Sequence, residues 1–180
     1  MATQESIQFA NRFGLNVKVY EYVDGTAGET EVLEIDFANS CALDISGERV
    51  WATGGQEHAN KIAFNDPIQG TFTISTQIMT NALLALMSGK APTGNDTEIV
   101  FENTATSPAY FTITAETVWQ NAKGTTQNET ITLHKVCPKR AYNMTYTGEG
   151  DPASIDVEFD VLQDALKKVV TINKAVAAAE

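Results

Sequence analysis

The side chains that could do chemistry in this sequence are few and lie far apart. The histidines and cysteines number two each, and they are His58, His134, Cys41 and Cys137. His134 and Cys137 form a His-x-x-Cys pair that could touch a metal ion, but strand alternation would place the two on opposite faces. We therefore predict no metal site and two reduced, buried thiols without a function.

Motifs for nucleophilic or cofactor chemistry do not occur in the sequence. It contains no Gly-x-Ser-x-Gly elbow, no phosphate-binding Gly-x-x-x-x-Gly-Lys loop and no dinucleotide-binding Gly-x-Gly-x-x-Gly motif. The turns at 94–96 and 148–151 offer oxygen atoms to calcium, but neither has the ordered ligand series of a calcium-binding loop. We therefore expect a protein that is not an enzyme and that uses no cofactor.

Carboxylates are the one chemical group present in excess. The chain has 23 Asp and Glu against 12 Lys and Arg, for a net charge of −11. Such a surface repels phosphate, so binding of nucleic acid through a basic patch is excluded. Asp156, Glu158 and Asp160 alternate with apolar residues, which indicates the solvated face of a strand rather than a pair of catalytic carboxylates.

Short alternating runs place most of the chain in strands. Apolar and polar residues alternate in five runs, which are 15–23, 31–37, 110–119, 129–137 and 155–162. A chain of 180 residues with 43% hydrophobic composition is long enough to bury one core. The sequence therefore predicts a single, mainly β domain over residues 1–180.

One helix is predicted where the alternation of apolar and polar residues typical of a strand ends. Phe72 and Ile74 alternate with polar residues, and beyond Ile78 the apolar residues recur at spacings of three and four. We expect a helix over about 77–88, capped by Thr76 and ended by Gly89. The side chains expected to pack it on the sheet are Met79, Leu83, Leu86 and Met87.

Three segments are predicted to lie outside the compact part of the domain. Residues 52–69 are predicted to be a long loop, either a flexible surface loop or an assembly segment anchored on a neighbouring subunit by Ile62 and Phe64. Residues 1–12 are expected to be an N-terminal arm and 163–180 a C-terminal arm or tail. Within the latter, the run DALKKVVTI fits either a helical turn or a final strand.

The sequence carries no signal for a membrane. No apolar run reaches the ~18–20 residues of a membrane-spanning helix. Residues 1–10 lack the basic start and the apolar centre of a signal peptide. We expect the chain to fold in a cytoplasm and to insert into no membrane.

Three stretches together resemble the major tail proteins, or tail tube proteins, of long-tailed bacteriophages. They are the Gly-x-Phe-x-Ile strand that runs into an apolar helix at 70–89, the long loop before it, and the run GEGDPASIDVEFDVL at 148–162. That family often shows a Gly-Asp-Pro turn leading into an alternating strand. The resemblance covers most of the chain, from about Leu15 to Ile172.

The resemblance implies a β-sandwich or half-barrel flanked by one helix. It also implies a structural protein of the virion whose subunits close into six-membered rings that stack into a hollow tail tube. Such tubes are assembled in the host cytoplasm around a tape-measure protein, between initiator and terminator proteins, and DNA passes through them to the host cell without specific binding.

The bore of tubes in this family is generally negative, so like charge lets duplex DNA slide without sticking. We predict that some of the carboxylates in strict outward phase on strands line the bore. These candidates are Glu34, Asp36, Glu116, Asp156, Glu158 and Asp160.

Two alternatives stay open. One is a monomeric β-sandwich binding module, for example for carbohydrate, with a stacking platform formed by Tyr20, Tyr22, Trp51, Tyr110 and Trp119. Because Trp119 shares its phase with Phe111 and Ile113, it fits a core better than a platform. The other is an enzyme with a diffuse acidic site.

Overall fold

The computed structural model of the chain describes residues 9–25, 30–35, 38–54, 59–93, 97–102, 107–121, 124–143 and 154–176. Within these ranges the strands are β1 (Phe9–Glu21), β2 (Glu31–Ile35), β3 (Ala38–Ser46), β4 (Arg49–Gly54), β5 (Ala59–Asn65), β6 (Gln69–Thr76), β7 (Phe111–Asn121), β8 (Thr126–Pro138), β9 (Ile155–Leu162) and β10 (Val170–Val176). The helix is α1 (Asn81–Met87).

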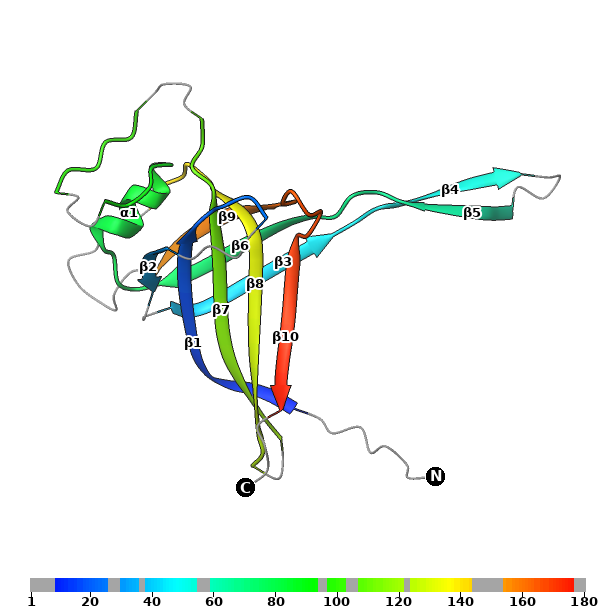
Figure 1. Ribbon diagram of the computed structural model, residues 1–180, viewed down its shortest axis with the longest axis horizontal. Helices are drawn as coiled ribbons and strands as arrows, with labels where there is room; N and C mark the ends of the chain where they lie inside the picture. Colours follow the sequence, from blue (N-terminus) through cyan, green and yellow to red (C-terminus); the bar gives the residue numbers. More distant parts are fainter. Residues whose placement is uncertain are drawn as a thin grey trace.

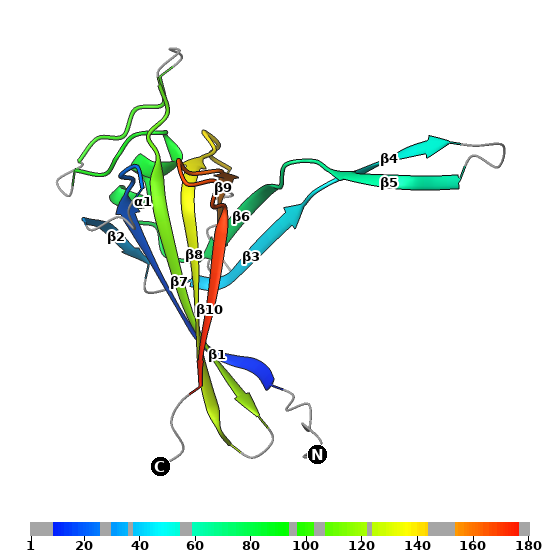
Figure 2. The same cartoon turned by 45° about the vertical axis from the view of Figure 1, so that its right-hand side comes forward.

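The fold is mainly β, as the sequence predicts. Eight strands form one antiparallel sheet in the order β2-β1-β7-β8-β9-β6-β3, and β10 pairs with β8 beside this path. The sheet curls into a half-barrel with α1 at one end, and β4 and β5 project from the other side (Figure 1; Figure 2). No helix in the described ranges combines the length and the apolar composition needed to cross a membrane.

The core lies on the concave face of the sheet because strand alternation sends every second side chain inward. Phe72 pairs with Phe159 and Ile74 with Val157 across β6 and β9, and all four are buried. Side chains of β1, β7 and β8 complete the same apolar cluster. Each large apolar side chain buried in this way contributes roughly 1.5–3 kcal/mol, an upper value for an extended unfolded chain.

The helix starts later than predicted. Thr76 is the last residue of β6 and pairs with Ile155, and residues 77–80 after it are not helical. Thr80 caps α1 instead, and its hydroxyl accepts a hydrogen bond of 3.2 Å from the backbone N–H of Leu83. Gly89 ends the helix as expected, with a φ of 84°.

The predicted packing residues of the helix take different positions. Leu83, Leu86 and Met87 are buried in the core cluster. Met79 precedes α1 rather than belonging to it, and its side chain is partly buried against the same cluster. The apolar stripe is therefore shared between the helix and the segment that leads into it.

The prediction of a long loop over 52–69 is wrong for its described part. Most of the segment lies in strands β4, β5 and β6, and 55–58 fall outside the described residues. Strand β5 pairs with β4 from Arg49↔Asn65 to Gly54↔Ala59. The predicted loop began at residue 52 and so left out Val50, which pairs with Phe64. Without Val50, the segment seemed to have too few apolar residues to form a strand.

Both terminal arms also contain strands. Phe9 already pairs with Asn121 of β7, so the described end of the predicted N-terminal arm belongs to the sheet. At the other end, a turn over 164–168 leads into β10, which settles the ambiguous run in favour of a strand. Residues 1–8 and 177–180 lie outside the described residues.

Candidate assembly interface

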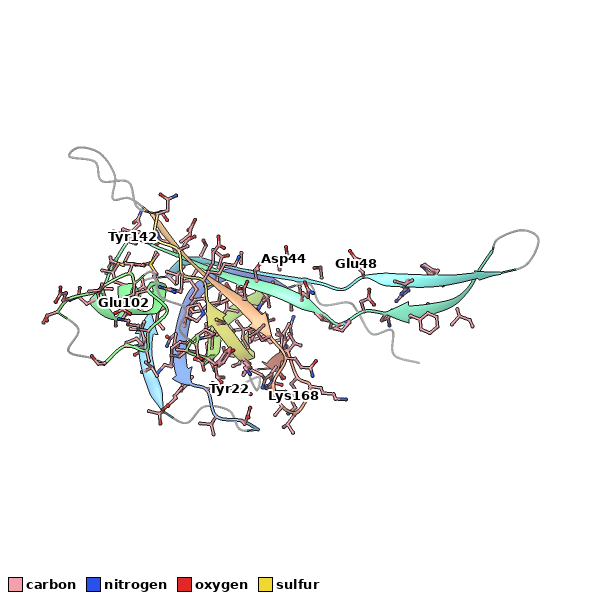
Figure 3. All side chains as sticks on the ribbon, turned by 90° about the horizontal axis from the view of Figure 1, so that it is seen from above. Tyr22, Asp44, Glu48, Glu102, Tyr142 and Lys168 are labelled. Atoms are coloured by element: carbon pink, nitrogen blue, oxygen red, sulfur yellow. The ribbon has the colours of Figure 1, made fainter. Side chains whose placement is uncertain are left out.

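The hairpin of β4 and β5, which we call the arm, projects from the half-barrel into open space (Figure 1; Figure 2). It continues the β3–β6 pair, and the backbone N–H of Asp66 donates a 2.9 Å hydrogen bond to the carbonyl of Glu48 at its root. Figure 3 shows the labelled Asp44 and Glu48 following one another where the arm leaves the sheet. The arm is therefore an ordered extension of the sheet.

One face of the arm is apolar and exposed. Val50 lies directly opposite Phe64, and Ile62 follows on the same face two residues along β5. Each of these three side chains is more than half exposed, and Ile62 and Phe64 reach 57%. The structure thus puts the two predicted anchor residues side by side and adds Val50, which sequence reasoning missed because it preceded the predicted loop.

The other face of the arm combines a cation with an aromatic ring. The guanidinium of Arg49 lies 5.7 Å from the ring centre of Trp51, and its Nε donates a 2.9 Å hydrogen bond to Asn65 Oδ1. Trp51 is itself 44% exposed. We call this surface the Arg49–Trp51 face.

A two-stranded arm that projects without a partner is energetically unfavourable. A two-stranded ribbon is marginally stable in water by itself, and its two edges offer unpaired backbone groups to other strands. Half-exposed Val, Ile, Phe and Trp side chains gathered on one hairpin gain most when a partner covers them. A projecting hairpin with such exposed side chains is suited to contact with a partner.

Part of the predicted acidic surface is a single cluster on the convex face of the sheet. Asp156, Glu158 and Asp160 lie opposite Ser75, Thr73 and Thr71 of β6, and the core residues of β9 alternate between them. Asp44 of β3 stands opposite Thr71 and extends the cluster across three strands. Sequence reasoning missed Asp44, although its alternation with Leu43 and Ile45 was a usable signal.

This β9 cluster is partly neutralised by neighbours. Lys139 Nζ lies 2.8 Å from Glu158 Oε2 and 3.8 Å from Asp160 Oδ1. The hydrogen bond to Glu158 raises the pKa of Lys139, so this cation stays charged at neutral pH. Ser75 donates a hydrogen bond to Asp156. The cluster is a negative surface with one fixed positive charge.

The other described candidates, Glu34 and Glu116, lie elsewhere on the same convex face. Glu34 of β2 contacts Lys18 of β1 at 3.2 Å, and Asn16 donates a 3.2 Å hydrogen bond to the same carboxylate. The hydrogen bond from Lys18 lowers the pKa of Glu34. Glu116 pairs with Asn16 across β1 and β7 and is exposed. In the sheet, β8 alone lies between Glu116 on β7 and the β9 cluster, and three strands lie between Glu34 on β2 and β9. Asp36 lies outside the described residues.

His134 belongs to a polar cluster beneath the turn between β9 and β10. Its Nε2 lies 2.7 Å from Thr171 Oγ1, and its Nδ1 lies 3.8 Å from Asp164 Oδ2. The order hydroxyl, imidazole, carboxylate is that of a hydrolase triad, but 3.8 Å is too long for a hydrogen bond. Asp164 instead accepts a 2.6 Å hydrogen bond from the backbone of Lys168. The cluster holds the turn against β8.

The prediction that His134 and Cys137 face opposite ways is wrong. A bulge in β8 opposite Thr112 lets both Leu133 and Val136 enter the core, so alternation is interrupted between them. His134 then reaches Thr171 and Cys137 pairs with Asp160, both on the convex face. In the described part of the chain, no group of three His, Cys, Asp or Glu side chains could hold a metal ion.

The two thiols are only half-buried. Burial raises the pKa of Cys41 to about 12, and it also raises the pKa of Cys137. Both are therefore protonated and poorly nucleophilic at neutral pH.

The aromatic residues form no common stacking platform. Tyr22 and Tyr110 meet edge to face at 6.4 Å, and Lys135 Nζ lies over both rings at 4.9 Å and 4.3 Å. Trp51 lies on the arm, and the ring of Trp119 is half-buried under Lys174 at 5.2 Å. Among the five candidate residues, the Tyr22–Tyr110 pair of rings is already covered by a cation of the chain itself.

Comparison with known proteins adds no assignment. The sequence matches no protein-family model and no curated protein.

Proposed function

We propose that this chain is the subunit of a bacteriophage tail tube, a structural virion protein that polymerises as stacked rings into the hollow tube through which DNA reaches the host cell. The observation that carries the proposal is the projecting arm, whose exposed apolar face a neighbouring subunit could cover. Its place in the chain matches the long loop on which the resemblance to tail tube proteins rests. A tube subunit needs such an element to reach a neighbour.

The free edges of the sheet support assembly into rings. Strands β2 and β3 end the sheet, and β10 pairs with β8 alone among the described strands. Ring closure requires two different surfaces that meet head to tail, and open strand edges supply them through backbone hydrogen bonds. The hexameric ring itself is expected from the resemblance.

The convex acidic surface supports a negative bore. The β9 cluster and the Glu34 group both point away from the core, where they can face a lumen. A net charge of −11 keeps DNA mobile inside such a tube. A map of the assembled tube with all these carboxylates on its outside would contradict this part of the proposal.

The test is to add two charges to the apolar face of the arm. Ile62→Asp together with Phe64→Asp should leave the monomer folded, because neither side chain contributes to the core. Negative-stain microscopy and sedimentation should show rings or tubes for the wild type and none for the double variant. Far-UV circular dichroism and a urea midpoint check the fold.

A matched control adds the same charges elsewhere. Val23→Asp together with Leu166→Asp changes two side chains that are 49% and 56% exposed but lie outside the arm. This variant should assemble as the wild type does. Normal tubes from the arm variant, or equal loss of tubes in both variants, would contradict a special role for the arm.

A further inference from the structure

We propose that strand β10 of one copy of this chain pairs with β8 of a second copy, in place of that copy's own β10, so that subunits are joined by exchange of this strand. The structure gives the contacts of such an interface directly, because an exchanged β10 would make on a second copy the pairs that it makes within its own chain. The inference goes beyond the proposed function. It involves neither the arm nor the acidic surface, so either proposal can fail without the other.

Strand β10 adds little to the core of its own chain. Among residues 165–174 none is fully buried, and the two that pack against the core cluster, Val169 and Val170, are only partly buried. Ile172 lies opposite Ile131 of β8 but is 53% exposed. The domain therefore keeps its core when β10 leaves, which is the condition for exchanging a strand without unfolding the rest.

Backbone pairing and polar contacts hold β10 on β8. Seven residue pairs align the two strands. His134 Nε2 lies 2.7 Å from Thr171 Oγ1, and Lys174 Nζ lies 3.0 Å from Oε2 of the buried Glu129. Without β10, Glu129 loses its cation and the edge of β8 loses its hydrogen-bonding partner. An empty β8 edge is therefore unfavourable and accepts the β10 of any copy within reach.

Strands β9 and β10 follow one another along the same edge of β8. Leu162 at the end of β9 pairs with Lys135, and Val170 at the start of β10 pairs with Leu133. Two residues of β8 span only about 7 Å, whereas the connection over 163–169 reaches up to about 25 Å when extended. The connection is therefore folded back as a turn within the chain. Once opened, it is long enough to carry β10 to the sheet of a neighbour.

The turn that closes this connection is strained. Lys167 has a φ of 63°, and no other residue with a side chain in the described ranges has a positive φ. An extended hinge releases the cost of this left-handed conformation. Asp164 opposes the release, since its Oδ1 accepts a 2.6 Å hydrogen bond from the backbone N–H of Lys168. A strained hinge of this kind favours exchange of the element that follows it.

The direct test is a disulfide between two different chains. Thr130 and Asn173 face one another across β8 and β10, and facing residues of antiparallel strands lie within disulfide range. Thr130→Cys and Asn173→Cys are prepared as separate full-length chains of different mass, refolded together from urea at several concentrations and oxidised with glutathione disulfide. Mixed dimers should form in a proportion that rises with concentration. Peptide mapping separates this disulfide from any formed by Cys41 or Cys137.

Two controls make the result decisive. Thr73→Cys lies on β6, away from β10, and should give few mixed dimers when it replaces Thr130→Cys. A single chain carrying both Thr130→Cys and Asn173→Cys should form the disulfide within itself when dilute, which shows that the two positions are well placed. If that chain closes but the mixture yields no more mixed dimer than the control, strand exchange is overturned.

Two variants of the hinge should change the exchange in opposite directions. Lys167→Asn relieves strain in the closed turn, because asparagine tolerates the left-handed conformation. It should lower the exchanged fraction by about fivefold for each hinge that opens. Asp164→Ala removes the acceptor for Lys168 and should raise the fraction by about as much. Changes of the same sign in both variants, or no change in either, would overturn exchange through this hinge.

The outcomes separate the two proposals. Tubes from the wild type without mixed dimers would overturn strand exchange and leave the tube function standing. Mixed dimers without rings or tubes at any concentration would support strand exchange and contradict the tube function.

Discussion

Gly70 occupies a place where any side chain would collide with the backbone. A Cβ on this residue would lie 2.8 Å from the carbonyl oxygen of Asp44 on the paired strand β3. We expect Gly70→Ala to lower the free energy of unfolding by roughly 1–3 kcal/mol, because the β3–β6 pair must move apart. Urea denaturation measures the change.

Gly47→Ala is the matched control for this prediction. Its Cβ would meet the carbonyl oxygen of Asp66 at 3.7 Å, which is an ordinary contact, so stability should change by less than about 0.5 kcal/mol. Equal effects of the two substitutions would show that the close approach at Gly70 carries no special cost.

His134 makes the stability of the fold depend on pH. Burial lowers its pKa below 6.5, Asp164 opposes this change and Lys168 adds to it. The unfolded chain therefore takes up the proton first as the pH falls. Stability that depends on neutral His134 is complete above pH 6.5 and is lost as the pH falls toward the folded pKa.

We expect the urea midpoint to fall more between pH 7.5 and 5.5 in the wild type than in His134→Gln. Glutamine keeps a hydrogen-bonding group for Thr171 but does not titrate. The difference between the two proteins therefore reports the effect of protonating His134 on stability. The same pH dependence in both proteins would assign it to carboxylates instead.

At the scale of elements, the start of α1 can be tested at its cap. Thr80→Ala removes the hydroxyl that accepts from Leu83 and should cost about 1 kcal/mol, whereas Thr80→Ser should keep most of the stability. Thermal unfolding measures both. An unchanged midpoint in Thr80→Ala would argue for a cap at another residue.

The elements that were predicted correctly are those whose pattern lies within one continuous stretch of the sequence. Strand β9 alternates without interruption, and Gly89 marks the helix end by its positive φ. The start of α1 was missed because the strand β6 runs through Thr76, where it pairs with the distant strand β9, and residues 77–80 then stay outside the helix. The bulge beside His134 was missed for the same kind of reason, since the partner strands decide it.

The candidate interface was only partly predictable. Ile62 and Phe64 stood out as apolar residues in a polar segment, but their strand partner and the Arg49–Trp51 face depend on the hairpin register.

At the scale of the whole molecule, net charge would set the conditions for the proposed assembly. Subunits of charge −11 repel one another, and salt screens this repulsion. Raising ionic strength from about 0.01 M to about 0.15 M shortens the Debye length from about 30 Å to about 8 Å and should lower the critical concentration for assembly. Sedimentation across a salt series measures it. A critical concentration that rises with salt would mean that specific ion pairs outweigh the general repulsion.

The continuity between the arm and the sheet also decides how the molecule bears a load. The arm runs on from β3 and β6, and β6 is hydrogen-bonded in turn to β9. A force along the arm therefore loads the hydrogen bonds of both strand pairs together, in shear. A force across the arm would break these hydrogen bonds one at a time. Subunits joined through their arms would resist stretching of the filament far better than peeling from its end.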